Sequence, residues 1–214
     1  MAVSHPVFAR LFARASVAMD QAGVAAHRRR LVAGLHGRVV EVGAGNGRNL
    51  AHYPPAVTRV LAVEPEPLLR GLARAAAPTA PVSVTVAAGL AEALPVPDGA
   101  ADAVVLSLVL CSVSDPAVAL REARRVLRPG GELRFYEHVV AETPGLRRVQ
   151  RVVDATLWPL VSAGCHTGRD TVAAIRAAGF TVTDLDRFRF PSTGVPAPAS
   201  PHVLGTAVAP VSPR

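Results

Sequence analysis

Short apolar runs and longer amphipathic segments alternate along most of this 214-residue chain. The apolar runs lie at residues 38–42, 59–64, 82–86, 103–108 and 132–140, and they are rich in valine and other strand-forming residues. The segments between them carry apolar residues at helical spacing or the turn signals that end a helix. Because strand and helix alternate from residue 38 to 140, we predict a parallel sheet with helices on both faces.

The two ends of the chain extend this α/β pattern. Residues 6–34 predict one or two helices, 144–162 predict a helix that contains Trp158, and a further helix opens at 167–170 and ends at Gly179. Residues 180–186 and 202–209 predict two antiparallel strands joined by a Pro/Ser/Gly-rich loop. We therefore expect a seven-stranded, mostly parallel sheet with one antiparallel edge strand. The expected division is a helical cap at 1–35, the α/β domain at 36–209 and a frayed tail at 210–214.

The first apolar run leads directly into a glycine-rich turn, Gly43-Ala44-Gly45-Asn46-Gly47. Glycines let the backbone turn tightly and let a ligand approach without a Cβ in the way. We predict that a helix begins near Asn46 and points its free N–H groups at that ligand. The turn does not match a dinucleotide-binding turn, whose third glycine would fall at Arg48, and a chain without lysine cannot form a P-loop.

Glu64 ends the second apolar run, about 20 residues after the glycine turn, where folds of this type carry an acid that binds ribose hydroxyls. The alternative is a strand-end glutamate with no ligand. Carboxyl ends of parallel strands meet at one edge of a sheet, so the glycine turn, Glu64, Gly89 and Cys111 are expected to converge on one crevice.

Composition narrows the function further. The net charge is +7, but only 4% of residues are aromatic and the basic residues are scattered, so no nucleic-acid partner is predicted and the run at 27–30 is interpreted as solvated surface. Cys111 and Cys165 do not make a disulfide framework. No apolar run of about 18 residues and no signal-peptide pattern occurs, which favours a cytoplasmic protein.

Two levels of family resemblance follow from longer motifs. Residues 98–105 and 125–131 resemble the S-adenosylmethionine (SAM)-dependent methyltransferase domain shared by many small-molecule enzymes. Residues 108–113, 136–139, 164–166 and 201–205 resemble the methyltransferase-like thiol S-methyltransferases, which are membrane-associated enzymes that methylate small alkyl thiols. The resemblance implies a Rossmann-like class I methyltransferase fold with SAM as cofactor and a small-molecule methyl acceptor.

The resemblance also implies roles for individual positions. Glu41 and the glycine turn would hold the methionine end of SAM, Glu64 its ribose, and residues 88–90 its adenine. Leu90 cannot accept a hydrogen bond from the adenine amino group, so a backbone group or Glu92 must do so. The expected cofactor-binding residues are Glu41, Gly43, Ala44, Gly45, Asn46, Gly47, Glu64, Pro65, Ala88, Gly89, Leu90, Leu108 and Cys111.

Methyl transfer from SAM is a direct in-line displacement that depends mainly on alignment. A free thiol, with a pKa near ~8.5, is roughly 3% ionised at pH 7, so a weak base is sufficient. His138 is the expected base, with Glu137 pointing to the opposite face of the same strand, and His166 is a second candidate. No metal site is predicted, because Cys165-His166 has no second pair at ligand spacing.

Several alternatives remain open at this point. The acceptor could be an oxygen or nitrogen of a natural product, quinone or lipid head group, or the chain could be a non-catalytic SAM-binding module. The thiol S-methyltransferases carry an apolar N-terminal anchor, whereas Arg10 and Arg14 interrupt any such segment here. Contact with a membrane surface is therefore possible but not favoured, and both a monomer and a homodimer are compatible with the sequence.

Overall fold

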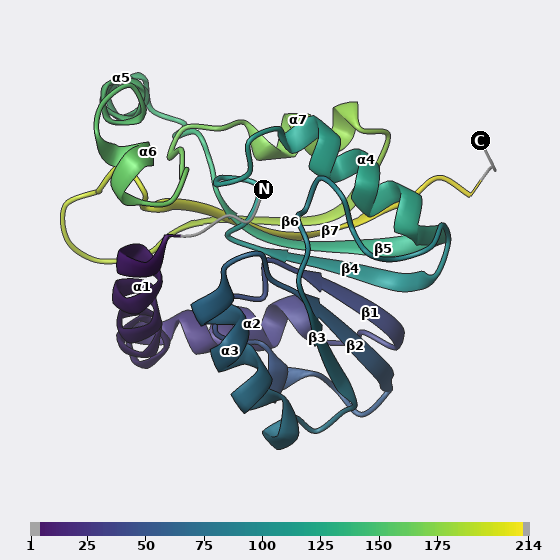
Figure 1. The fold of residues 1–214 in the computed structure, drawn as a ribbon. Helices are drawn as coiled ribbons and strands as arrows, with labels where there is room; N and C mark the ends of the chain where they lie inside the picture. The colour runs from purple at the N-terminus through teal and green to yellow at the C-terminus, as the bar shows by residue number, and fades with distance from the viewer. Residues whose placement is uncertain (1–4, 212–214) are drawn as a thin grey trace.

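A computed structural model describes residues 5–211 of the chain, and its centre is one seven-stranded sheet (Figure 1). The strands follow the order β3-β2-β1-β4-β5-β7-β6. Their bounds are Gly37–Val42 for β1, Val57–Val63 for β2, Val84–Ala87 for β3, Ala101–Ser107 for β4, Leu127–His138 for β5, Thr181–Arg189 for β6 and Pro201–Val208 for β7.

The predicted fold class is confirmed. Strands β1 to β5 pair in parallel, whereas β7 runs antiparallel to both β5 and β6. The antiparallel strand is therefore one place inside the sheet, and the outermost strand on that side is β6. The switch of strand order falls between β1 and β4, where α/β sheets bind their ligands.

Helices cover both faces of the sheet, with α4 and α7 on one face and α2 and α3 on the other (Figure 1). Two apolar cores result, one including Leu120 and Ile175 under α4 and α7, the other including Leu31 and Tyr53. The helices are Pro6–Met19 (α1), Ala25–Val32 (α2), Pro67–Ala76 (α3), Pro116–Val126 (α4), Pro144–Asp154 (α5), Trp158–Val161 (α6) and Thr171–Ala177 (α7).

The N-terminal helical region contains a kink. A π-helical segment, Asp20–Val24, joins α1 to α2, and Gly23 inside it has a φ of 122° that only glycine adopts readily. The prediction of one or two helices over 6–34 is thus confirmed as two helices with a distinct bend. A bend of this type changes the direction in which α1 leaves the domain.

Two predicted helices are wrong. The helix expected from Asn46 is only a 3₁₀ turn at Leu50–His52, because the left-handed Gly47 (φ 78°) precedes it and Pro54-Pro55 stops it. The helix expected over 144–162 is broken between α5 and α6, where residues 155–157 form a turn ahead of Pro159.

Two further sequence expectations concern the C-terminal tail and membrane-spanning segments. Of the predicted tail, residues 212–214 lie outside the described part of the chain, and the strand before it ends at Val208. Within residues 5–211 no helix is both long and apolar enough to cross a membrane.

Candidate active site

The glycine turn leaves β1 at the carboxyl edge of the sheet with an unusual backbone. Gly43, Gly45 and Gly47 all have φ between 56° and 78°, the left-handed region that favours glycine. A Cβ on Gly43 would stand 2.6 Å from Cγ2 of Val109, in the loop after β4. The sequence therefore needs glycine here both for the turn and for the close approach of the next strand's loop.

Glu64 follows β2 and faces this turn. One oxygen of its carboxylate accepts the Gly45 N–H at 2.8 Å and the other accepts the Glu66 N–H at 2.9 Å. The side chain is buried, and burial raises its pKa. The structure therefore brings together the two features that the sequence analysis placed 19 residues apart.

Glu41, at the end of β1, is the centre of a buried polar network. Its carboxylate accepts hydrogen bonds from Asn49 Nδ2 at 2.9 Å and from the Tyr53 hydroxyl at 2.8 Å. Arg28 donates to Asn49 Oδ1 at 2.9 Å and to Asp20 at 2.8 Å. Burial raises the pKa of Glu41 to about 7, although both of its hydrogen bonds oppose this rise.

A narrow opening of about 20 Å³, room for about one water molecule, lies against the glycine turn. Phe12 of α1 covers it, and its ring lies 3.3 Å from the position that a Cβ on Gly45 would take. Asn46 Nδ2 donates to Ser16 Oγ of the same helix at 2.9 Å. The lining residues are Phe12, Arg28, Glu41, Gly43, Ala44, Gly45, Asn46, Arg48, Asn49, Ser107 and Leu108.

Of the thirteen predicted cofactor residues, six line this opening, and Glu64 accepts the Gly45 N–H of the glycine turn. Gly89 packs closely on β2, because a Cβ there would stand 2.7 Å from Val63 Cγ1. Glu92, the alternative partner for adenine, accepts hydrogen bonds from the Ser114 backbone and hydroxyl. Cys111 does not line the opening and belongs to the cluster described below.

The loop after β4 is held by Glu137 of β5. This fully buried carboxylate accepts the backbone N–H groups of Val109 at 2.9 Å, Leu110 at 3.0 Å and Cys111 at 3.3 Å. Burial raises the pKa of Glu137 to about 7, against the effect of these three hydrogen bonds. Glu137 therefore fixes the loop through its backbone, and its neighbour His138 approaches the Cys111 side chain of the same loop.

His138 lies in a cluster with two sulfur atoms. A ring nitrogen of His138 and the sulfur atoms of Cys111 and Cys165 all lie within 4.8 Å of one another. The Cys165 Sγ to His138 Nδ1 distance is 3.6 Å. Both cysteines are buried, and interaction with the Cys111 thiol lowers the pKa of Cys165.

The other two histidines near this cluster have separate partners. His166 Nδ1 lies 2.8 Å from the Gly164 carbonyl and 3.2 Å from the Arg169 guanidinium. His202 packs edge-on against His138, and its burial lowers its pKa to about 3, so it is neutral. Of the two predicted bases, His138 contacts a thiol and His166 contacts the arginine.

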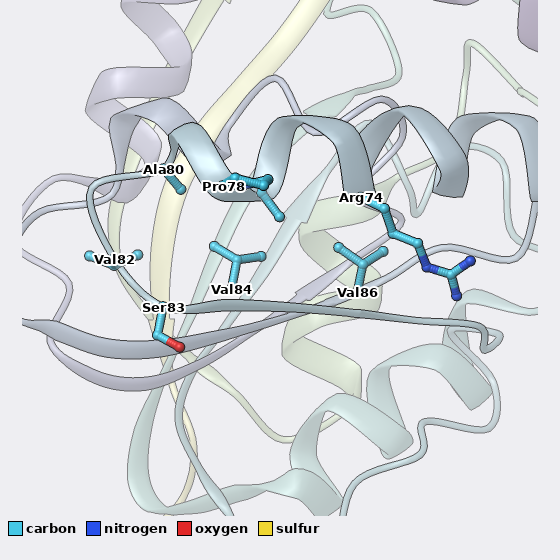
Figure 2. A pocket seen from close by; sticks show the side chains of 8 residues that line it. Arg74, Pro78, Ala80, Val82, Ser83, Val84 and Val86 are labelled. Carbon is cyan, nitrogen blue, oxygen red and sulfur yellow. The ribbon is translucent and has the colours of Figure 1, made fainter.

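A wider groove of about 440 Å³ lies elsewhere, between α3 and the edge strand β3 (Figure 2). Val84 and Val86 point from the strand toward the helix, and Arg74 is the charged side chain that lines the groove. The groove runs along the outer strand from residues 78–83, which precede β3, to Val86 near its end, and neither Glu64 nor the glycine turn lines it. Despite its size, it offers no cluster of reactive groups, so we place the active site at the narrower opening.

Comparison with known proteins identifies the family of this chain. Residues 40–135 match the family described as a methyltransferase domain. The human thiol S-methyltransferase TMT1B is 34% identical over 180 residues, which cover 82% of this chain and 72% of that protein. The ubiquinone/menaquinone biosynthesis C-methyltransferase UbiE of Caulobacter vibrioides (strain NA1000 / CB15N) is 33% identical over 117 residues, 55% of this chain and 45% of that enzyme.

This chain belongs to the class I SAM-dependent methyltransferases. A solved structure of a SAM-dependent methyltransferase, possible histamine N-methyltransferase, from Thermotoga maritima has the same fold, with a TM-score of 0.66 and 23% identity. The match covers 94% of this methyltransferase and 99% of that chain.

The residues of this methyltransferase fit the SAM cofactor. The glycine turn forms a cradle that Cβ atoms would fill, and a buried acid contacts it. Ser107 Oγ lines the opening and is buried, and no described residue forms a hydrogen bond with it. Leu108, beside it, has a φ of 58°, a strained value for leucine that is often found at functional sites.

Sequence reasoning missed Arg28. The run at 27–30 was interpreted as solvated surface, but the Arg28 side chain is buried against the cofactor opening. Its spacing held the signal, because Val24, Arg28, Leu31 and Val32 share one helical face and all are buried. A charged residue on an apolar helical face indicates a paired, buried charge.

Proposed function

We propose that this methyltransferase transfers the methyl group of SAM to the sulfur of a small-molecule thiol. The observation that carries the proposal is the extent of the similarity. The match to TMT1B leaves out fewer than 40 residues of this chain, so it must include part of the 74 residues after position 140. The match to UbiE, a C-methyltransferase, covers only 55% of the chain.

The cofactor roles follow from the groups around the opening. Arg28 carries the positive charge suited to a carboxylate, and Glu41 the negative charge suited to an ammonium group, so these two are assigned to the amino-acid end of SAM. Glu64 is assigned to the ribose, and residues 88–90 to the adenine. When bound, SAM supplies an electrophilic methyl group on a positively charged sulfur.

The N-terminal helix α1 acts as a cover for this site in the proposal. Phe12 and the hydrogen bond between Asn46 and Ser16 place α1 on the glycine turn, and the opening beneath it is far smaller than a nucleoside. The kink at Asp20–Val24 separates α1, the proposed cover, from α2, which carries Arg28. Closure over the reactants excludes water, which strips the solvation shell of the nucleophile.

The acceptor side suits a thiol better than an alcohol. Glu137 already binds three backbone N–H groups, and His166 contacts Arg169. What remains near the site is a weak base, His138, among buried apolar and sulfur groups. A thiol needs only such a base, because its pKa is near ~8.5, whereas an alcohol requires much stronger help.

Exposed apolar side chains on the helices near the site favour an apolar acceptor. Leu11 lies on α1, the helix that bears Phe12. Leu157 immediately precedes α6 and Leu160 lies within it, and Trp158 of the same helix interacts with Cys165. These three leucines are 62–76% exposed. Alkyl or aryl thiols are therefore the expected substrates.

A turnover screen tests the proposal. The purified protein is incubated with SAM and matched acceptors that differ only in the nucleophile, such as an alkyl thiol, the corresponding alcohol and the corresponding amine. We expect S-methyl product from the thiol alone, identified by mass spectrometry together with S-adenosylhomocysteine (SAH). Methylation of only the alcohol or the amine would reject the thiol assignment, and no SAH binding by calorimetry would reject the cofactor site.

A further inference from the structure

The cluster of Cys111, His138 and Cys165 has the geometry of a metal-binding site. Its three donor atoms lie within 4.8 Å of one another, and one sulfur–nitrogen separation is 3.6 Å. With zinc–sulfur bonds of about 2.3 Å and zinc–nitrogen bonds of about 2.0 Å, tetrahedral ligands stand about 3.5–3.8 Å apart. Small side-chain adjustments would therefore bring all three donor atoms onto one ion.

We propose that Cys111, His138 and Cys165 bind a divalent cation of the zinc type, whose fourth position receives the sulfur of the acceptor thiol. Two cysteines and one histidine form a donor set of catalytic zinc sites, which keep one position open. Thiolates select zinc over magnesium or calcium. The inference rests on the proposed function, because it states how the same thiol is held and ionised.

The three ligands come from separate elements that the fold fixes in place. Cys111 lies in the loop after β4, which Glu137 holds through three backbone N–H groups. His138 is the last residue of β5. The loop that carries Cys165 is tied to the first loop, because the His166 N–H donates to the Cys111 carbonyl at 2.8 Å and Arg169 donates to the Leu110 carbonyl at 2.6 Å. Such preorganisation is what a metal site requires.

The surroundings of the two sulfur atoms suit thiolates. Ser112 Oγ lies 3.4 Å from Cys111 Sγ, and Trp158 interacts with Cys165. Outer partners of this kind hold first ligands in position and tune the metal. The cysteines are 1% and 7% exposed, whereas His138 is half-buried, so a small acceptor reaches the cluster from the side of the histidine.

The reaction at this site balances without an oxidant or reductant. The acceptor thiol loses its proton to solvent when its sulfur binds the cation, so His138 serves at this site as a ligand rather than as the base. A lone pair of that thiolate forms the new sulfur–carbon bond to the methyl group. The bond between the methyl group and the sulfonium breaks, and its electron pair stays on the sulfur of SAH. The product thioether is a neutral, weaker ligand and leaves.

Cobalt titration of the full-length, reduced and metal-stripped protein tests the site without any turnover. We expect one Co²⁺ per chain, with sulfur-to-cobalt charge transfer and the intense visible bands of a four-coordinate ion. Cys111→Ser and Cys165→Ser should remove these bands or weaken cobalt binding by at least about tenfold. His36→Ala, a change of an exposed histidine distant in sequence, is the matched control and should bind cobalt like the wild type.

Folding and oxidation are controlled in the same series. Calorimetry measures the SAH affinity of each variant. Only variants that bind SAH, and in which the cofactor site is therefore folded, are compared. A protein that binds no cobalt when reduced overturns the proposal, and so does cobalt binding that survives the Cys111→Ser/Cys165→Ser double change. A disulfide between the two cysteines that reforms under the reducing conditions of the titration also overturns it.

The open position is tested by adding an alkyl thiol to the cobalt-loaded protein. We expect additional sulfur-to-cobalt charge transfer, which the corresponding alcohol does not produce; an unchanged spectrum would overturn the open position. Thiol methylation that persists undiminished after metal removal and in Cys111→Ser would reject the metal site but leave the proposed function intact. Cobalt binding without methylation of any thiol would support the metal site but reject the proposed function.

Discussion

The two halves of the sheet build their parts of the site in different ways. On the side of β1 and β2, the proposed cofactor residues come mainly from one turn and one strand end, and the Gly45 N–H donates to the Glu64 carboxylate 19 residues away. On the side of β4 and β5, Cys111, His138 and Cys165 are spaced by 27 residues each and come together only in the folded chain.

The comparison shows what each half depends on. The cofactor half depends on backbone shape, because a Cβ at Gly43 would meet Val109 at 2.6 Å. The acceptor half depends on side chains that hold loops, above all Glu137. Changes in the first half should therefore alter SAM affinity, and changes in the second half should alter stability and acceptor chemistry.

The largest expected effect is on stability in the acceptor half. Glu137→Ala leaves three buried backbone N–H groups without their acceptor, each costing about 1–3 kcal/mol. We expect the free energy of unfolding to fall by roughly 3 kcal/mol or more in denaturant titrations. Glu132→Ala on the same strand, which removes a partly exposed pair with Arg134, should cost no more than about 1 kcal/mol. Similar losses in both variants would contradict the role given to Glu137.

The next effect is on cofactor affinity. Glu64→Ala should weaken SAH binding by about 100-fold, because two hydrogen bonds from ribose to a charged group are worth about 1.5 kcal/mol or more each. Calorimetry measures the change. Glu132→Ala is the matched control, since Glu132 pairs with Arg134 and does not line the opening, and its SAH affinity should stay close to that of the wild type. An affinity within about twofold of wild type for Glu64→Ala would show that the ribose lies elsewhere.

The smallest of the three effects is a pH dependence. Burial raises the pKa of Glu41 to about 7, so its carboxyl is mostly protonated at pH 6 and mostly ionised at pH 8. Only the ionised form pairs with an ammonium group, so SAM affinity should rise about tenfold between these pH values. Glu41→Gln should flatten this dependence. The same slope in both proteins would assign the titration to another group.

The cofactor half of the site was easier to predict from the sequence than the acceptor half. The glycine turn and Glu64 were found because a contiguous motif and a strand end carry them, and the alternation of strands and helices gave the sheet. The 3₁₀ turn after Gly47 was missed because the left-handed backbone and the role of Asn49 in the Glu41 network are not visible as patterns.

The acceptor half was less visible because its contacts are long-range. No metal site was predicted, because Cys165-His166 has no second pair at ligand spacing along the chain, whereas the structure groups Cys165 with Cys111 and His138. Glu137 and His138 were singled out together at the end of one strand, but the loop that Glu137 binds could not be identified from spacing. Arg28 was misjudged because it was interpreted from its charge alone, without considering that it lies on the apolar face of its helix.

The kinked segment Asp20–Val24 bears on the speed of each catalytic cycle. Asp20 forms ion pairs with Arg28 of α2 and with Arg48 beside the glycine turn, at 2.8 Å and 2.6 Å, so one carboxylate at the bend joins the cover to the floor of the cofactor site. Release of spent cofactor then competes with the re-forming of these pairs. An enzyme built in this way would be paced by how often its first helix swings aside rather than by the methyl transfer itself.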